Sequence, residues 1–308
     1  MAAVQIEGLV KRYGKVFAVD GLSLTVDEGT LLGLIGPNGA GKTTTIKVML
    51  GLLKPNMGKV EVFGKDPWDN PEIKTRIGVV YEKPIFPVHH EVLSYLEKTC
   101  RIFGVHESKA KETLETVGLQ KEAFNRPIKG LSAGMLQKFA IAHALIHEPE
   151  FVIADEPTSN LDPQARNEIL NLFSRLHHDE KTTFLVSSHI LPELSNICES
   201  VAIINQGRVW AQGSFLELCE KLRIGVTRIS TDNPQKLVEV MRKLNYVRKI
   251  KMDSRGVSVD VPEAEKQQLY EDVVSLAKKN NVKISGIESK TALLEELYDR
   301  AVSQGRDG

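Results

Sequence analysis

Gly36-Pro-Asn-Gly-Ala-Gly-Lys-Thr43 places three glycines directly before a Lys-Thr pair. The preceding segment, Thr30–Ile35, is continuously apolar and predicts a buried strand. The following run, Thr44–Leu53, predicts a helix. A strand, a glycine loop, Lys-Thr and a helix together form the full context of a phosphate-binding loop.

The residue types in this loop suit a nucleoside triphosphate. Glycines let consecutive backbone N–H groups converge on phosphate oxygens, and the helix N-terminus adds a favourable dipole. Lys42 supplies a positive charge for the β- and γ-phosphates, and the Thr43 hydroxyl is a hard oxygen ligand for Mg²⁺. The loop therefore predicts binding of a nucleotide with magnesium.

A pair of carboxylates lies 113 positions after Lys42. Phe151–Ala154 is apolar and predicts a second buried strand, which runs into Asp155-Glu156-Pro157. Unpaired charge at the end of a buried strand is costly, so a bound Mg²⁺ gives Asp155 its reason to be there. Glu156 is placed to accept a proton from water that attacks the γ-phosphate.

Further segments follow in a fixed order. Leu131-Ser-Ala-Gly-Met135 precedes the second strand by one helix, Ser159-Asn-Leu-Asp162 follows it, and Ser187-Ser-His189 comes after a third predicted strand, Thr183–Val186. This order resembles the nucleotide-binding subunit of an ABC transporter over roughly residues 4–215. The resemblance implies an α/β P-loop ATPase domain with an edge β-subdomain, a RecA-like core and a helical subdomain.

The resemblance also implies roles for individual residues. Ser132 and Gly134 would bind the γ-phosphate held by the other subunit, and Ser132 can cap the helix that follows it. His189 matches the switch histidine, Tyr13 matches the aromatic that stacks on adenine, and Ser159–Asp162 resembles the D-loop that couples two sites. The expected nucleotide-binding residues are Tyr13, Gly36, Pro37, Asn38, Gly39, Ala40, Gly41, Lys42, Thr43, Thr44, Ser132 and Gly134; the expected catalytic residues are Glu156, His189 and Lys42; the expected metal ligands are Thr43, Asp155 and Glu82.

Three positions depart from the commonest pattern. Ala133 and Met135 replace Gly and Gln, and Ala133 is harmless if it has helical dihedral angles. Glu82 occupies the place of a glutamine that senses Mg²⁺ and the membrane partner. Its carboxylate either approaches the Mg²⁺ or pairs with Lys83 or another cation. Similar replacements occur in relatives that power export-type permeases.

The expected domains are residues 1–220, with a helical subdomain at about 83–146, and residues 221–308. Two apolar stripes support that subdomain, one comprising Val92, Tyr95, Leu96, Ile102 and Phe103 and the other Leu114, Val117 and Leu119. The apolar, proline-bearing segment Lys83–Pro87 favours an interface, with a plain loop as the alternative. After Phe215 the pattern predicts a ferredoxin-like β-α-β-β-α-β order and a last helix, residues 290–302, with Leu294, Leu297 and Tyr298 on one face.

Other residue clusters are better explained without chemistry. His143 and His147 have helical spacing but lack the glutamate of a zinc hydrolase, and we expect them to be ordinary helix residues. The pairs at 89–90 and 177–178 are expected to be solvated. The five cations between Arg242 and Lys251 are expected to form a solvated face.

Composition limits the function. Lys plus Arg and Asp plus Glu both number 40, so no net positive field recruits nucleic acid. No apolar run approaches the about 20 residues of a bilayer span, and the start lacks the pattern of a secretion signal. Three cysteines without a C-x-x-C pair fit a reducing cytosol. A cytoplasmic protein is therefore expected, and the resemblance implies that it is peripheral on the cytoplasmic face of the membrane.

The favoured hypothesis is an ATPase subunit that dimerises around MgATP and drives a separate integral membrane permease, with export as the expected direction. The dimer is either a homodimer or a heterodimer with a related chain. One alternative is a soluble ATPase acting on nucleic acid or ribosomes, and another is a regulatory ATP-binding module. A single cassette, zero net charge and an intact Glu156 and His189 favour the transporter subunit.

Overall fold

The computed structural model describes residues 1–190, 193–194, 197–214, 217–218, 226–253, 256–288 and 298. The chain divides into two compact units, Met1–Gln212 and Gly213–Gly308. Phe215, Cys219 and most of the predicted last helix, including Leu294 and Leu297, lie outside the described residues.

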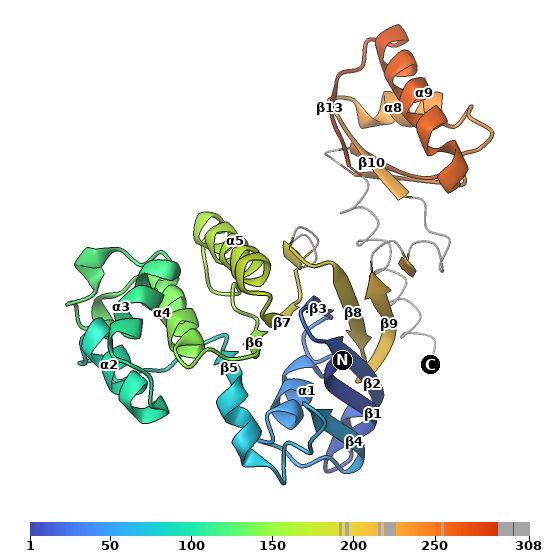
Figure 1. Cartoon of the computed structure of the whole chain (residues 1–308). Coiled ribbons are helices and arrows are strands. Elements are labelled where there is room, and N and C mark those ends of the chain that lie inside the picture. Colours follow the sequence, from blue (N-terminus) through green and yellow to red (C-terminus); the bar gives the residue numbers. More distant parts are fainter. Residues whose placement is uncertain are drawn as a thin grey trace. The chain divides into compact units, whose positions relative to one another are not determined.

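A six-stranded sheet forms the centre of the first unit, in the order β5-β6-β7-β3-β8-β9 (Figure 1). Four of its neighbouring pairs, β5 with β6, β6 with β7, β7 with β3 and β3 with β8, are parallel. Parallel strands are buried on both faces, which explains the continuously apolar runs. The strands are β3 (Leu31–Ile35), β5 (Ile77–Val80), β6 (Phe151–Asp155), β7 (Thr183–Ser188), β8 (Ser200–Asn205) and β9 (Arg208–Ser214).

A second sheet has the order β2-β1-β4. Strands β1 (Ala2–Tyr13) and β2 (Val16–Asp27) form an antiparallel hairpin, and β4 (Met57–Val62) pairs antiparallel with β1. This sheet corresponds to the edge β-subdomain that the resemblance implies.

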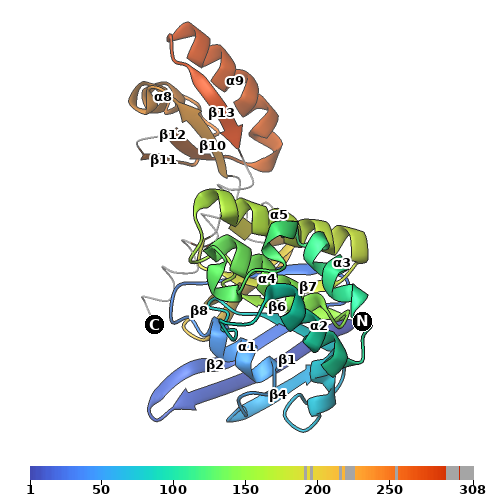
Figure 2. The ribbon, with the colours of Figure 1, turned by 90° about the vertical axis from the view of Figure 1, so that its left-hand side faces the viewer.

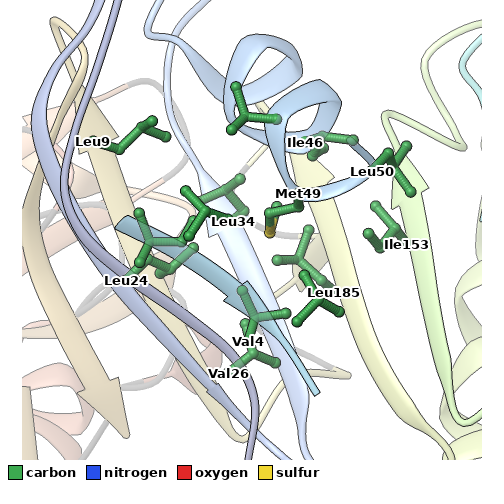
Figure 3. Packing of buried hydrophobic residues seen from close by; sticks show 14 of the residues in the cluster. Val4, Leu9, Leu24, Val26, Leu34, Ile46, Met49, Leu50, Ile153 and Leu185 are labelled. Carbon is green, nitrogen blue, oxygen red and sulfur yellow. The ribbon is translucent and has the colours of Figure 1, made fainter. Parts of the chain in front are cut away.

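Helix α1 (Lys42–Met49) shares one hydrophobic core with both sheets. Figure 3 shows Met49 between Leu24 of β2 and Ile153 of the central sheet, with Leu50 beside Ile153. The helix ends four residues before the predicted Leu53, because the chain turns after Met49 and the Gly51 N–H donates to the Val48 carbonyl. The phosphate-binding loop is therefore anchored at both ends in the core.

Helices α2 (Val92–Phe103), α3 (Ser108–Thr116) and α4 (Ala133–Leu145) pack together on the side of the first unit away from β1, β2 and β4 (Figures 1 and 2). Val92 and Leu96 are buried, as predicted, but Ile102 is 81% exposed, so its place in the apolar stripe was wrong. Further helices of this unit are α5 (Pro163–Glu180) and the short 3₁₀ helices η1 (Pro71–Arg76), η2 (Lys121–Ala123) and η3 (Ile128–Gly130).

The second unit has an antiparallel sheet in the order β11-β12-β10-β13. Its elements are β10 (Val226–Thr231), α8 (Pro234–Met241), β11 (Lys249–Asp253), β12 (Gly256–Asp260), η4 (Glu263–Glu265), α9 (Lys266–Lys279) and β13 (Ile284–Glu288). This is the predicted β-α-β-β-α-β order. Ile229, Val257, Leu237 and Leu269 belong to a core of its own.

Among the described residues, none of the helices combines the length and the apolar character that a membrane crossing requires.

Candidate functional site

The phosphate-binding loop connects β3 to α1, as predicted, and its shape requires glycine at two positions. Gly41 caps α1 with φ of +105°, and a Cβ there would lie 2.5 Å from the Ala18 carbonyl oxygen. A Cβ on Gly36 would lie 2.3 Å from the carbonyl oxygen of Ile204 in β8. The loop therefore packs closely against the neighbouring backbone. The first N–H groups of α1, which have no partners within the helix, are available to an anion bound in the loop.

Lys42 is 5% exposed, and its ammonium group is held over the loop. Its Nζ donates to the carbonyl oxygens of Gly36 at 2.7 Å and Pro37 at 3.2 Å. Nζ also forms an ion pair with Glu156 Oε1 at 3.1 Å. A buried ammonium with these partners offers a fixed positive charge to an anion in the loop.

Asp155 ends β6 and is 6% exposed. The Ser187 hydroxyl of β7 donates to Asp155 Oδ1 at 2.7 Å and accepts the Glu156 N–H at 2.9 Å. One hydroxyl on the neighbouring strand therefore fixes both carboxylate-bearing residues. Burial and the negative charge of Asp155 raise the pKa of the nearby Tyr81 phenol.

Glu156 has a strained backbone and two charged or polar partners. Its φ of +49° lies in the left-handed region, where a residue with a Cβ is uncommon and such strain tends to mark functional sites. Oε1 contacts Lys42, and Oε2 lies 2.5 Å from His189 Nδ1. The His189 side chain is 36% exposed, so one face of the glutamate–histidine pair remains open.

These residues surround a hollow of about 490 Å³, which we call the loop pocket. The described residues that line it are Val16, Phe17, Ala18, Asn38, Gly39, Ala40, Gly41, Lys42, Thr43, Thr44, Glu82, Glu156, Ser159 and His189. Glu82 thus reaches the pocket, and its Oε1 also lies 3.9 Å from Lys83 Nζ. Asp155, Gly36, Pro37 and Tyr13 are not in this lining.

A second hollow of about 380 Å³, the signature pocket, contains Ser132 and Gly134. The Ser132 hydroxyl accepts the Met135 N–H at 3.3 Å, which confirms the predicted cap of α4, and Ala133 is helical. The described lining residues are Gly118, Leu119, Gln120, Ser132, Ala133, Gly134, Met135, Lys138, Asp162, Gln164, Ala165 and Glu168. The two pockets share none of these residues.

The segment Ser159–Asp162 joins the two pockets. Ser159 lines the loop pocket, and Asp162 lines the signature pocket, where its carboxylate caps α5 through the N–H groups of Gln164 and Ala165. Three peptide bonds therefore separate a contact in one pocket from a contact in the other.

Two histidine predictions need comment. His177 was expected to be solvated, but its Nδ1 lies 3.0 Å from the Thr182 carbonyl oxygen, because the chain folds back after α5. His143 packs on Phe86 and Tyr95, and burial lowers its pKa. The His147 ring stacks on Phe103, and its Nε2 lies 3.2 Å from the Ile77 carbonyl oxygen. Within the described residues, no three His, Cys, Asp or Glu side chains come together as a metal site around these histidines or elsewhere.

Phe86 belongs to the segment Lys83–Pro87, for which the sequence favours an interface, and its own ring packs against the helical subdomain. It lies 4.8 Å from the Phe139 ring and 5.7 Å from the Tyr95 ring, measured between centroids. Ile85, its neighbour, is 93% exposed. Phe17 was not among the residues predicted from the sequence. It pairs with Arg12 across the β1–β2 hairpin and lines the loop pocket.

We expect Phe17→Ala to weaken ATP binding by about tenfold, since stacking of a base on an aromatic ring contributes about 1–3 kcal/mol. Tyr13→Ala is the matched comparison, because Tyr13 lies on the paired strand but outside the pocket lining. Titration of a fluorescent ATP analogue measures both. A larger loss for Tyr13→Ala would assign the adenine contact to Tyr13, the residue that the sequence predicts.

The fold and the loop pocket define a phosphate-binding-loop ATPase. The family model described as ABC transporter matches residues 19–159. The chain is 39% identical over 222 residues to a bacitracin transport ATP-binding protein of Bacillus licheniformis, covering 71% of this chain and 72% of that protein. It is 31% identical over 306 residues to a linearmycin resistance ATP-binding protein of Bacillus subtilis, covering 96% of each. The chain belongs to the ABC transporter ATP-binding proteins.

Solved structures agree with this assignment. An ATP-binding subunit of an ABC transporter superposes with a TM-score of 0.64 at 28% identity, covering 72% of this chain and 93% of that one. A bacterial ABC transporter cassette solved as a dimer superposes with a TM-score of 0.62 at 25% identity, covering 68% and 98%. The family and the P-loop ATPase fold predicted from the sequence are confirmed, and the protein is an ATP-hydrolysing subunit.

Proposed function

We propose that two copies of this chain, or this chain and a related one, close head to tail around two MgATP molecules and thereby drive a membrane permease. The observation that carries the proposal is the separation of the loop pocket from the signature pocket. Lys42 and Ser132 each supply half of a phosphate site, and they line different hollows of one chain. A two-fold pair would complete both sites with one interface.

The loop pocket fits a magnesium ion and the phosphates of ATP. Thr43, Glu82 and Glu156 bring hard oxygen atoms to its lining, and Asp155 stands directly before Glu156 at the end of β6. We assign Thr43, Asp155 and Glu82 to the metal, directly or through water. When bound, Mg²⁺ neutralises charge that develops on the transferred phosphoryl group.

The other roles in phosphate binding and hydrolysis are assigned to residues of this chain. Lys42 exchanges its contacts with loop carbonyls and Glu156 for the β- and γ-phosphates. Release from Lys42 leaves the Glu156 carboxylate free to accept a proton from the attacking water. His189, 2.5 Å from Glu156 Oε2, orients that carboxylate and faces the γ-phosphate. Asn38, Gly39, Ala40, Gly41 and Thr44 enclose the phosphates, and Gly36 and Pro37 shape the loop behind them.

Export is supported by similarity that extends beyond the ATPase unit. The linearmycin resistance protein matches almost the whole chain, and a daunorubicin/doxorubicin resistance ATP-binding protein of Streptomyces peucetius is 34% identical over 248 residues, 79% of this chain and 74% of that protein. We propose an export role for this chain, which would bind to the cytoplasmic face of the membrane through its permease. The second unit would be an accessory or dimer-stabilising domain, and its predicted start at residue 221 remains a prediction.

The test of this function is co-purification from detergent-solubilised membranes of the native organism. A tagged chain should retain an integral membrane protein, and the purified pair should move a compound across vesicle membranes only with hydrolysable ATP. Glu156→Gln is the matched control, because it should keep the partner and lose transport. Recovery of ribosomes or nucleic acid in place of a membrane protein would favour the soluble alternative.

We expect Glu82→Ala to raise the Mg²⁺ concentration needed for half-maximal ATPase activity, because it removes an oxygen ligand from the loop pocket. ATPase rates measured across a magnesium titration give the result. Lys83→Ala is the control, since it removes only the cation that lies 3.9 Å from Glu82. An unchanged magnesium dependence with a loss of transport alone would assign Glu82 to the permease interface.

A further inference from the structure

A buried ionic network lies beside the switch histidine, and none of the roles above uses it. Its centre is Glu193, whose side chain is 5% exposed. Arg166 of α5 forms an ion pair with it: Nε lies 3.0 Å from Glu193 Oε1, although these two atoms do not have hydrogen-bond geometry. Burying a carboxylate is costly unless a positive charge or hydrogen-bond donors lie close to it, as Arg166 does here.

The second oxygen of Glu193 joins two segments that enter the loop pocket. The Thr158 hydroxyl donates to Glu193 Oε2 at 2.7 Å, and the Ser188 hydroxyl donates to the same atom at 3.2 Å. Thr158 directly precedes Ser159, and Ser188 directly precedes His189; both following residues line the loop pocket. One carboxylate oxygen therefore ties the two segments together immediately behind the site.

Arg166 extends the network toward the signature pocket. Its Nη2 donates to the Leu161 carbonyl oxygen at 3.4 Å, and Leu161 directly precedes Asp162 of the signature-pocket lining. The pair therefore contacts the chain at both ends of the Ser159–Asp162 segment. Glu193 accepts from Thr158, just before the segment, and Arg166 donates to Leu161, just before Asp162.

Stability alone does not explain this arrangement. Replacing a buried ion pair by well-packed apolar side chains is often neutral or stabilising, so such pairs are weak evidence for a stabilising role. Hydrogen bonds to an ionised acceptor are short and directional, and they hold their donors in a narrow range of positions. Hydrolysis needs that precision, because a displacement of about 1 Å can lower a rate by about 10²-fold.

We propose that Glu193 is a positioning residue for ATP hydrolysis: it fixes the switch segment and the Ser159–Asp162 segment relative to each other, so that His189 and Ser159 face the γ-phosphate together. It touches neither the nucleotide nor the attacking water. The inference rests on the proposed roles of Glu156 and His189, and it adds a residue that sets their geometry.

The test compares turnover with nucleotide binding. Glu193→Gln keeps the size of the side chain and removes its charge, so kcat should fall about tenfold or more while the Kd for ATP stays within about twofold. Thr158→Val probes the same contact without touching the buried charge and should lower kcat in the same direction. Thr158→Ser keeps the hydroxyl and should retain near-wild-type kcat.

A combined variant and a control separate positioning from general damage. If the two residues act through one hydrogen bond, Glu193→Gln with Thr158→Val should lose no more turnover than the more severe single variant. Glu150→Gln makes the same change at an exposed ion pair with Arg76 and should leave kcat unchanged. Unchanged kcat in both Glu193→Gln and Thr158→Val would overturn the inference, as would a parallel loss of ATP affinity and thermal stability. Glu156→Gln tests the general base independently of Glu193. A loss of turnover in Glu156→Gln would therefore support the proposed function whether the Glu193 inference holds or fails.

Discussion

Glu156→Gln should still bind MgATP and should lower kcat by about 10²-fold or more, the loss expected for a missing general base. Glutamine preserves the size of the side chain and can still form hydrogen bonds in the loop pocket, but its amide cannot accept the proton from water. ATP affinity and phosphate release measured on the same preparation give the two quantities. Turnover close to wild type would remove Glu156 from the catalytic assignment, and Glu150→Gln serves again as a surface control.

Ser132→Arg, introduced into the Glu156→Gln background, should abolish ATP-induced dimerisation while the monomer continues to bind ATP. Arginine places a bulky side chain in the signature pocket, where the partner's γ-phosphate would arrive, whereas the loop pocket shares none of its described lining. The molecular mass of the protein in solution, measured with ATP, with ADP and without nucleotide, distinguishes monomer from dimer. The dimer should require ATP and be weaker with ADP, because the γ-phosphate is the shared ligand.

Loss of the helix cap must be separated from the steric effect. The Ser132 hydroxyl accepts the Met135 N–H, and removing such a cap costs about 1 kcal/mol of stability. Ser132→Ala loses the same cap without adding bulk, so it should dimerise better than Ser132→Arg. Monomer mass in all nucleotide states of the parent Glu156→Gln protein, at tens of micromolar, would exclude the homodimer and leave the heterodimer.

Local features of the fold could be predicted because consecutive residues determine them. The loop from Gly36 to Thr43 lies between an apolar strand and a helix, and strands at residues 151 and 183 follow from uninterrupted apolar runs. The cap formed by Ser132 follows from its position before the helical run. The carboxyl ends of parallel strands then bring Asp155, Glu156 and His189 to the phosphate loop.

Contacts between distant segments could not be predicted in the same way. The packing of Phe86 on Phe139 depends on where α4 lies beside the segment after β5. The network around Glu193 needs β7, α5 and the segment after β6 to be placed together. Ile102 illustrates the same limit. Its spacing predicted burial, but an apolar residue near the end of a helix need not contact another element, and Ile102 is exposed.

The shared core of the two sheets has a consequence for hydrogen exchange. Strand β4 contributes none of the described lining of the loop pocket, yet Val60 and Val62 pack in one cluster with Ile46 and Met49 of α1. Breaking the hydrogen bonds between β4 and β1 around Val60 and Val62 therefore requires opening the core that anchors the loop. A ligand that binds only the closed form makes such openings rarer by the factor 1 + [L]/Kd. ATP should thus slow deuterium uptake in β4, a strand that it never touches, and mass spectrometry of β4 peptides would report nucleotide occupancy from the far side of the core.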